Sequence, residues 1–152
     1  MRKLLVLVVA ASAALGAVPA SATPPSPVNA TFAVVTATTT STRTAGGNTF
    51  MTLTRTAAVS GTFTGVTTDD VLLVMHANGT TSLRGTGTCT CTVDGRSGTF
   101  VYGFRGSGIF PTSGTGRYVV RHGTGGLAGL HASGPFSGDF AVSTVGGRYH
   151  FD

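Results

Sequence analysis

The sequence contains no tryptophan, no glutamate and no glutamine, and its one lysine is Lys3. The strongest helix formers are therefore almost missing, and no segment shows the 3.6-residue apolar period of an amphipathic helix. Threonine and glycine are abundant instead. Threonine is β-branched and favours strands, while glycine marks turns, bulges and tight bends of a sheet. The composition therefore predicts an all-β protein.

Acidic residues are also scarce. The chain has 5 acidic and 10 basic residues, a formal net charge of +5 and a pI near 10.0. A surface that follows nucleic-acid phosphates needs clustered basic side chains, and here the arginines are spread along the sequence. We therefore attribute the high pI to the lack of acids and expect no nucleic-acid partner.

A long hydrophobic run occurs only at the start of the chain. Arg2 and Lys3 precede the apolar stretch Leu4–Leu15, and Ala20-Ser21-Ala22 has the small residues of a cleavage site. The stretch is too short for a permanent membrane span. We expect residues 1–22 to be a signal peptide, the mature protein to be secreted without a membrane anchor, and residues 23–152 to form one domain. Residues 23–28 are expected to be a proline-rich, extended leader.

Alternating segments predict eight strands after this leader. A short helical turn is expected within residues 123–131. Strands joined in simple order favour an antiparallel eight-stranded up-and-down barrel, because closure removes exposed sheet edges. A β-sandwich of the same strands is the alternative. The expected strands are residues 32–42, 50–59, 66–76, 80–93, 98–110, 116–122, 136–144 and 148–151, with Gly146-Gly147 joining the last two.

Two turns predict the register of the middle strands. A hairpin centred on Asn78-Gly79 places Val74 opposite Leu83, and one centred on Gly95-Arg96 places Cys91 opposite Phe100. Both registers give the same apolar face, formed by Val66, Leu72, Val74, Leu83, Cys89, Cys91, Val93, Phe100, Tyr102 and Phe104.

The register of residues 116–122 is open. One loop length places Arg117, Val119 and Arg121 inside the barrel. The other places Tyr118, Val120 and His122 there, and we favour it because it is more apolar.

The apolar face defines the candidate ligand site. Its aromatic side chains would contact an apolar ligand, and the Tyr102 hydroxyl would orient it. The two cysteines form either a disulfide or a pair of buried thiols. Asp70 falls on the same face beside Leu72. Its carboxylate is either paired with another group inside the barrel or exposed to solvent at the barrel rim. The candidate ligand-binding residues are Tyr102, Cys89, Cys91, Phe100, Phe104 and Asp70.

The sequence predicts neither a metal nor a cofactor. The four histidines show no close metal-ligand spacing along the chain. The glycines of residues 123–128 match a dinucleotide-binding pattern, but the crossover unit that this motif requires does not fit in the remaining chain.

Three segments resemble a known family. Cys91–Phe100, Gly123–Leu130 and Gly61–Gly65 resemble segments of uncharacterised bacterial secreted proteins with the allene oxide cyclase barrel fold. The resemblance implies an eight-stranded antiparallel barrel, often assembled into oligomers. Fold relatives include plant cyclases that constrain a reactive fatty-acid epoxide and dirigent proteins that steer radical coupling. The plant cyclases use a barrel glutamate, and this chain has none, so that role is not carried over.

Three functions follow as hypotheses. The first, which is not enzymatic and is favoured, is a secreted barrel that binds a small apolar molecule in its lumen. The second is a cyclase-like or isomerase-like enzyme acting on a reactive hydrophobic substrate. The third is a structural module that forms a homo-oligomer through Leu73, Met75 and Ile109 on its outer face.

Overall fold

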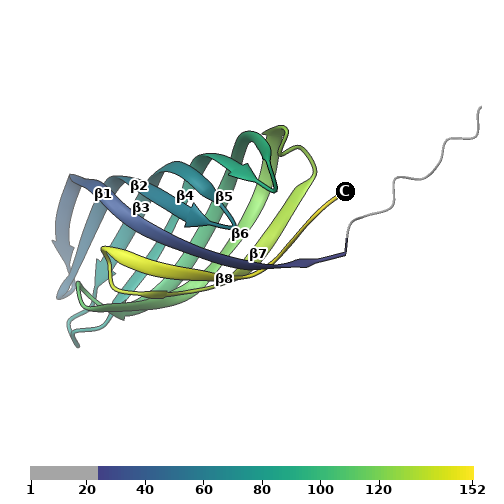
Figure 1. Ribbon diagram of the computed structural model, residues 1–152. Helices are drawn as coiled ribbons and strands as arrows, with labels where there is room; N and C mark the ends of the chain where they lie inside the picture. Colours follow the sequence, from purple (N-terminus) through teal and green to yellow (C-terminus); the bar gives the residue numbers. More distant parts are fainter. Residues whose placement is uncertain (1–23) are drawn as a thin grey trace, which may run out of the picture.

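The computed structural model describes residues 24–152, so the signal peptide expected at residues 1–22 lies outside the described part of the chain. Eight antiparallel strands follow one another around a closed barrel (Figure 1). The expected all-β fold is confirmed. The strands form the expected barrel and not the alternative β-sandwich. Among residues 24–152 no helix is long and apolar enough to cross a membrane. The strands are β1 (Ser26–Ala45), β2 (Asn48–Gly61), β3 (Thr64–Met75), β4 (Thr81–Val93), β5 (Arg96–Ile109), β6 (Ser113–Gly125), β7 (Leu130–Gly138) and β8 (Val142–Phe151).

The last two strands begin earlier than the sequence suggested. The chain turns after Gly138, where Asp139 Oδ1 accepts hydrogen bonds from the backbone N–H groups of Ala141 (2.8 Å) and Val142 (2.6 Å). This is the short aspartate turn that competes with strand pairing. The predicted turn at residues 146–147 is wrong, because both glycines lie inside β8. The turn expected within residues 123–131 lies between β6 and β7, where the N–H groups of Leu127 and Ala128 donate to the carbonyls of Thr124 (3.1 Å) and Gly125 (3.2 Å), three residues earlier.

The first predicted register is wrong by one residue. Leu73, not Val74, lies opposite Leu83. The loop spans five residues rather than two, since the His76 N–H donates to the Thr80 carbonyl (2.8 Å). An odd shift moves every side chain of β3 to the other face of the sheet. Val71 and Leu73 are therefore buried, Val66 is exposed, and Leu72 and Val74 are only half-buried.

The second predicted register is wrong by two residues, which preserves the faces. The turn is Asp94-Gly95, and both residues have positive φ (49° and 73°), as a two-residue type I′ turn requires. Cys89, not Cys91, therefore lies opposite Phe100. An even shift keeps side chains on their side of the wall. Odd residues of β4 and even residues of β5 share the interior, as expected: Cys89, Cys91, Phe100 and Tyr102 are all buried.

For β6 we favoured the register that places Tyr118, Val120 and His122 inside the barrel. The structure confirms it for the first two of these residues. Tyr118 and Val120 are buried, while Val119 is exposed. A bulge lies at Arg121, because Val101 pairs with His122 but Tyr102 pairs with Val120. The extra residue turns His122 outward, where it is exposed. The prediction for His122 was therefore wrong.

The interior contains two apolar clusters, one toward each end of the barrel. The larger cluster surrounds Phe63, whose ring lies 5.5 Å from that of Phe100 and 6.4 Å from that of Tyr118. The smaller cluster is Val71, Leu73 and Leu83, with aromatic rings packed against it.

The proposed oligomer seam is contradicted for two of its three residues. Leu73 is fully buried, and Met75 packs against the smaller core cluster rather than lying on the outer face. Ile109 alone of the three is an exposed large apolar side chain. A homo-oligomer therefore stays a prediction, but the surface predicted to form its interface does not exist as proposed.

Strand pairing also brings arginines together on the outer surface. Arg84 lies opposite Arg105, and Arg105 lies opposite Arg117 in the next strand pair. All three are exposed. The arginines are spread along the sequence, but the fold gathers these three into one row on the surface. The expected lack of a nucleic-acid partner stays a prediction.

Candidate ligand site in the barrel lumen

A cavity of about 100 Å³ lies inside the barrel and touches both apolar clusters. Its wall is mostly aromatic, and its polar groups come from a few side chains on β2, β3, β5, β6 and β8 and from Asp139 in the β7–β8 turn. Such a wall, with few polar groups, is typical of small-molecule sites. The aromatic lining residues are Phe32, Phe63, Phe100, Tyr102, Phe104, Tyr118, Phe136 and Phe140, and the polar side chains among them include Arg55, Thr67 and Asp69.

Four of the six predicted site residues line this cavity, namely Cys89, Phe100, Tyr102 and Phe104. Their role in binding stays a prediction. Cys91 is buried, and a disulfide joins it to Cys89. Their Cα atoms are 5.4 Å apart, within the usual range for disulfides. Of the two alternatives left open by the sequence, the structure therefore has the disulfide.

Asp70 does not reach the lumen, and the prediction for it was wrong. Its side chain is exposed on the outer face, where Oδ1 accepts a hydrogen bond from the Thr54 hydroxyl (2.7 Å). The cause is the shifted β3 register, which places the preceding residue inside. Asp69 is 2% exposed and lines the cavity.

Asp69 accepts three hydrogen bonds inside the barrel. The Arg55 guanidinium donates through Nε to Oδ1 (2.9 Å) and through Nη2 to Oδ2 (3.0 Å). The Tyr102 hydroxyl donates to Oδ2 (2.9 Å). A buried carboxylate is tolerated when it is paired and hydrogen-bonded in this way. We call these three residues the Arg55–Asp69–Tyr102 group.

Aromatic rings enclose the positive charge of this group. The Arg55 Cζ lies 5.3 Å from the Phe32 ring centroid and 5.6 Å from that of Phe104. Cation–π contact adds to the ion pair where water is excluded. The lumen therefore contains a charge pair that is neutral overall, surrounded by apolar side chains.

Both lumen tyrosines are held neutral. Burial, followed by the nearby Asp69 carboxylate, raises the pKa of Tyr102 well above its ordinary value. Burial alone raises the pKa of Tyr118. Neither phenol is therefore suited to act as a base near neutral pH, and both remain hydrogen-bond donors.

Two hydroxyl groups in the cavity wall lack a partner. Among the described residues, Thr67 Oγ1 and the Tyr118 hydroxyl are buried without a hydrogen bond of good geometry. Thr67 lies near enough to the Tyr102 phenol to act on its pKa, which it lowers against the larger effects of burial and of Asp69. Leaving a buried polar group unsatisfied costs about 1–3 kcal/mol. Both groups line the cavity, so a ligand or water placed there would satisfy them.

Sequence reasoning missed Asp69, Thr67 and the pairing of Arg55. One signal was present, since Arg55 interrupts the otherwise apolar side of its strand. A charge on a buried face requires a partner from a neighbouring strand. Asp69 lies directly opposite Arg55 in the β2–β3 register.

The raised pKa of Tyr102 predicts a loss of stability in alkali. The unfolded chain releases this proton near pH 10, whereas the folded chain keeps it to higher pH. The stability is therefore fully present below about pH 10 and falls above it, by about 1.4 kcal/mol per pH unit for one such group. Urea unfolding at pH 8 and pH 11 measures the fall. A Tyr102→Phe variant should lose less stability between these pH values, and an equal loss in both proteins would contradict the assignment.

The family model described as "Protein of unknown function (DUF3224)" matches residues 28–151, which is nearly the whole barrel. The chain belongs to the DUF3224 family. A crystal structure of a DUF3224 protein of unknown function from Shewanella oneidensis MR-1 has a similar fold, with a TM-score of 0.71 and 19% identity. The match covers 85% of this chain and 99% of that chain. No curated protein matches. Membership in DUF3224 and the shared barrel give no activity, and the relationship to the allene oxide cyclases stays a prediction.

Proposed function

We propose that the barrel binds a small, mostly apolar molecule that carries one polar group. The observation that supports this most is the aromatic cavity in the lumen, with two unpartnered hydroxyls in its wall. Burial of apolar surface favours binding by about 25 cal/mol per Å². The free Tyr118 and Thr67 hydroxyls would orient the polar group of the ligand.

The volume limits the size of the ligand. A cavity of about 150 Å³ in an engineered protein binds benzene, and the lumen here measures about 100 Å³. The bound molecule therefore has at most about one ring, unless side chains at the mouth move. Phe140 lines the cavity from within the β7–β8 turn, so a movement of this turn, with loss of the ring contact to Phe110 (5.0 Å), would enlarge the cavity.

Matched ligands test the role of the free hydroxyls. Phenol and toluene have nearly the same shape, but only phenol hydrogen-bonds. Calorimetry should show phenol binding up to about tenfold more tightly, since one hydrogen bond contributes about 0.5–1.5 kcal/mol. Tyr118→Phe should abolish the preference if Tyr118 holds the polar group, and Thr67→Val should do so if Thr67 holds it. Preference unchanged in both variants, or no binding of either compound, would contradict the proposal.

A pair of glycine variants tests whether binding is in the lumen. A Cβ on Gly114 would lie 3.6 Å from the nearest atom of Phe140, so a side chain there fits and extends into the cavity. A Cβ on Gly146 has similar room, with Pro135 Cγ at 3.8 Å, but lies in a groove on the outer surface. Gly114→Leu should therefore block phenol binding, and Gly146→Leu should leave it unchanged.

We also propose that the protein acts outside the cytoplasm. The support is the signal-peptide pattern of residues 1–22 together with the disulfide between Cys89 and Cys91, because disulfides persist in oxidising compartments. Intact mass measured on protein from the culture medium of its own host tests both features. The mass should correspond to a chain starting at Thr23 and lacking two hydrogen atoms relative to the reduced form.

A cyclase-like or isomerase-like enzyme is the second candidate. What favours it is a lumen carboxylate within hydrogen-bond distance of a tyrosine and an arginine, as in the Arg55–Asp69–Tyr102 group. The group would position a reactive apolar substrate, as the resemblance to allene oxide cyclases implies. Against it, Asp69 is already fully engaged. Product distributions from a short-chain epoxide, with and without the protein, test it. Identical distributions would exclude it for that substrate class.

A further inference from the structure

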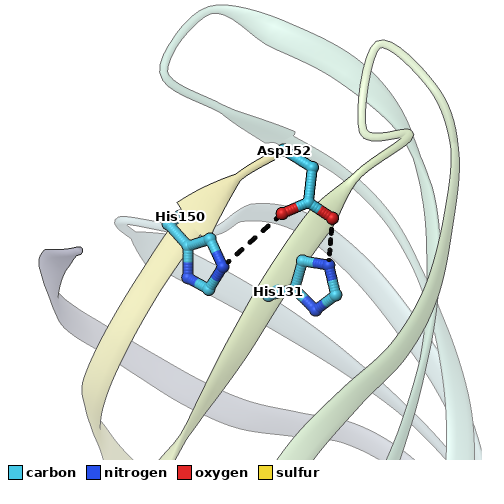
Figure 2. Close-up of side chains that lie close together, drawn as sticks. All are labelled: His131, His150 and Asp152. Atoms are coloured by element: carbon cyan, nitrogen blue, oxygen red, sulfur yellow. Dashed lines mark hydrogen bonds and ion pairs between the residues drawn. The ribbon is translucent and has the colours of Figure 1, made fainter. Parts of the chain in front are cut away.

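Three side chains of metal-ligating type meet on the outer surface at the β7–β8 pair, where His131 and His150 are distant in sequence but adjacent in the sheet (Figure 2). His131 lies directly opposite His150 in the register of the two strands. Asp152 follows His150 by two residues, and alternation along a strand places such residues on the same face. The flanking Leu130 and Phe151 are buried, so the three polar side chains point outward.

The ligand atoms converge on a common point. Asp152 Oδ2 lies 2.7 Å from His131 Nε2, and Oδ1 lies 3.8 Å from His150 Nε2. The two imidazole rings stack with centroids 5.0 Å apart and planes inclined by 11°. The three candidate ligand atoms all lie within 4.8 Å of one another. The ligand atoms of a tetrahedral zinc ion lie about 3.4 Å apart, so side-chain shifts on the order of 1 Å would close the site around an ion.

The backbone beneath the cluster is held in place. The Asp152 N–H donates to the Gly129 carbonyl (3.1 Å), which fixes the residue beyond the end of β8. Leu130 and Phe151 are cross-strand partners and are 3% and 4% exposed. Their burial anchors both strands next to the histidines. The backbone positions of the three residues are thus set before any ion binds, which lowers the cost of binding.

We propose that His131, His150 and Asp152 bind a divalent transition-metal ion of the zinc type. Two imidazole nitrogens and one carboxylate suit zinc, copper, nickel and iron, whereas magnesium and calcium prefer oxygen ligands. Three protein ligands leave room for water to complete the coordination shell. The ion would also link β7 to β8. The site is separate from the lumen, so it stands independently of the proposed ligand binding.

Calorimetry with zinc chloride on the purified protein, made without a histidine tag, tests the proposal. We expect one Zn²⁺ per chain and no binding of Mg²⁺. His131→Ala, His150→Ala and Asp152→Asn should each weaken Zn²⁺ binding by more than about tenfold, since loss of even an outer partner costs 10–100-fold. His122→Ala removes another exposed histidine and is the matched control, which should bind like the wild type.

A second readout separates the site from weak surface binding. Zn²⁺ should raise the midpoint of thermal unfolding of the wild type and of His122→Ala, but not of His131→Ala. All four side chains lie on the surface, and circular dichroism checks that the variants fold. Absence of Zn²⁺ binding, or equal weakening by His122→Ala and His131→Ala, would overturn the proposal.

Discussion

Asp69→Asn should lower the free energy of unfolding by about 3–5 kcal/mol, because removing one partner of a buried ion pair leaves the other charge unpaired. Arg55 would lose its carboxylate while its side chain is only 13% exposed. The asparagine side chain has one acceptor oxygen in place of two, so the three hydrogen bonds that Asp69 accepts cannot all be kept. Urea unfolding monitored by circular dichroism measures the change.

The neighbouring aspartate supplies the control. Asp70→Asn removes the same charge one residue along the chain, where the side chain is exposed and bonded to Thr54. Its effect should lie within about 0.5 kcal/mol, as for most surface substitutions. If the two variants were equally stable, the β3 register and the Arg55–Asp69–Tyr102 group would both be wrong.

Replacing the pair together should be milder than breaking it. Arg55→Met combined with Asp69→Leu leaves no buried charge, and apolar replacements of buried ion pairs are often neutral or stabilising. The double variant should therefore be more stable than either Arg55→Met or Asp69→Leu alone. Such non-additivity is the mark of two residues that act as one unit.

Gly87→Ala should cost about 1–3 kcal/mol through overpacking. Gly87 lies opposite Tyr102, and an added Cβ would come within 2.7 Å of the Tyr102 ring and within 2.6 Å of Asp69 Cβ. The ring must then move away from the carboxylate that it binds. Urea unfolding gives the cost, and the near-ultraviolet circular dichroism of tyrosine should change.

Gly114→Ala is the matched control for this prediction. It also faces the lumen, but the nearest atom to an added Cβ lies at 3.6 Å, an ordinary contact. The substitution should be neutral or stabilise by up to about 1 kcal/mol, because alanine restricts the unfolded chain. A larger loss from Gly114→Ala than from Gly87→Ala would mean that the lumen is arranged differently.

The fold class followed from the sequence because alternation and turn residues are local signals. Asp94-Gly95 is such a signal. The predicted turn was centred one residue too late, but this shifts the register by two residues, so the interior faces of β4 and β5 were still predicted correctly. Asn78-Gly79 misled the prediction, because it lies within a five-residue loop closed by His76 and Thr80. A register difference of one residue decided between Asp69 and Asp70 as the lumen carboxylate.

The rest of the site depends on pairing between distant segments. Arg55 meets Asp69, and His131 meets His150, through registers that no local motif encodes. Gly146-Gly147 resembles a turn in sequence, yet both residues lie inside β8, and Gly147 serves a close approach to β7, where an added Cβ would lie 2.6 Å from Gly134 Cα. Only the assembled barrel distinguishes a glycine that turns the chain from one that lets two strands approach.

A crystal structure of the protein soaked in phenol tests the central claim most directly. The account predicts the phenol ring within the aromatic lumen, with its hydroxyl within hydrogen-bond distance of the Tyr118 hydroxyl or Thr67 Oγ1. A lumen filled by its own side chains, or phenol bound only on the outer surface, would contradict it.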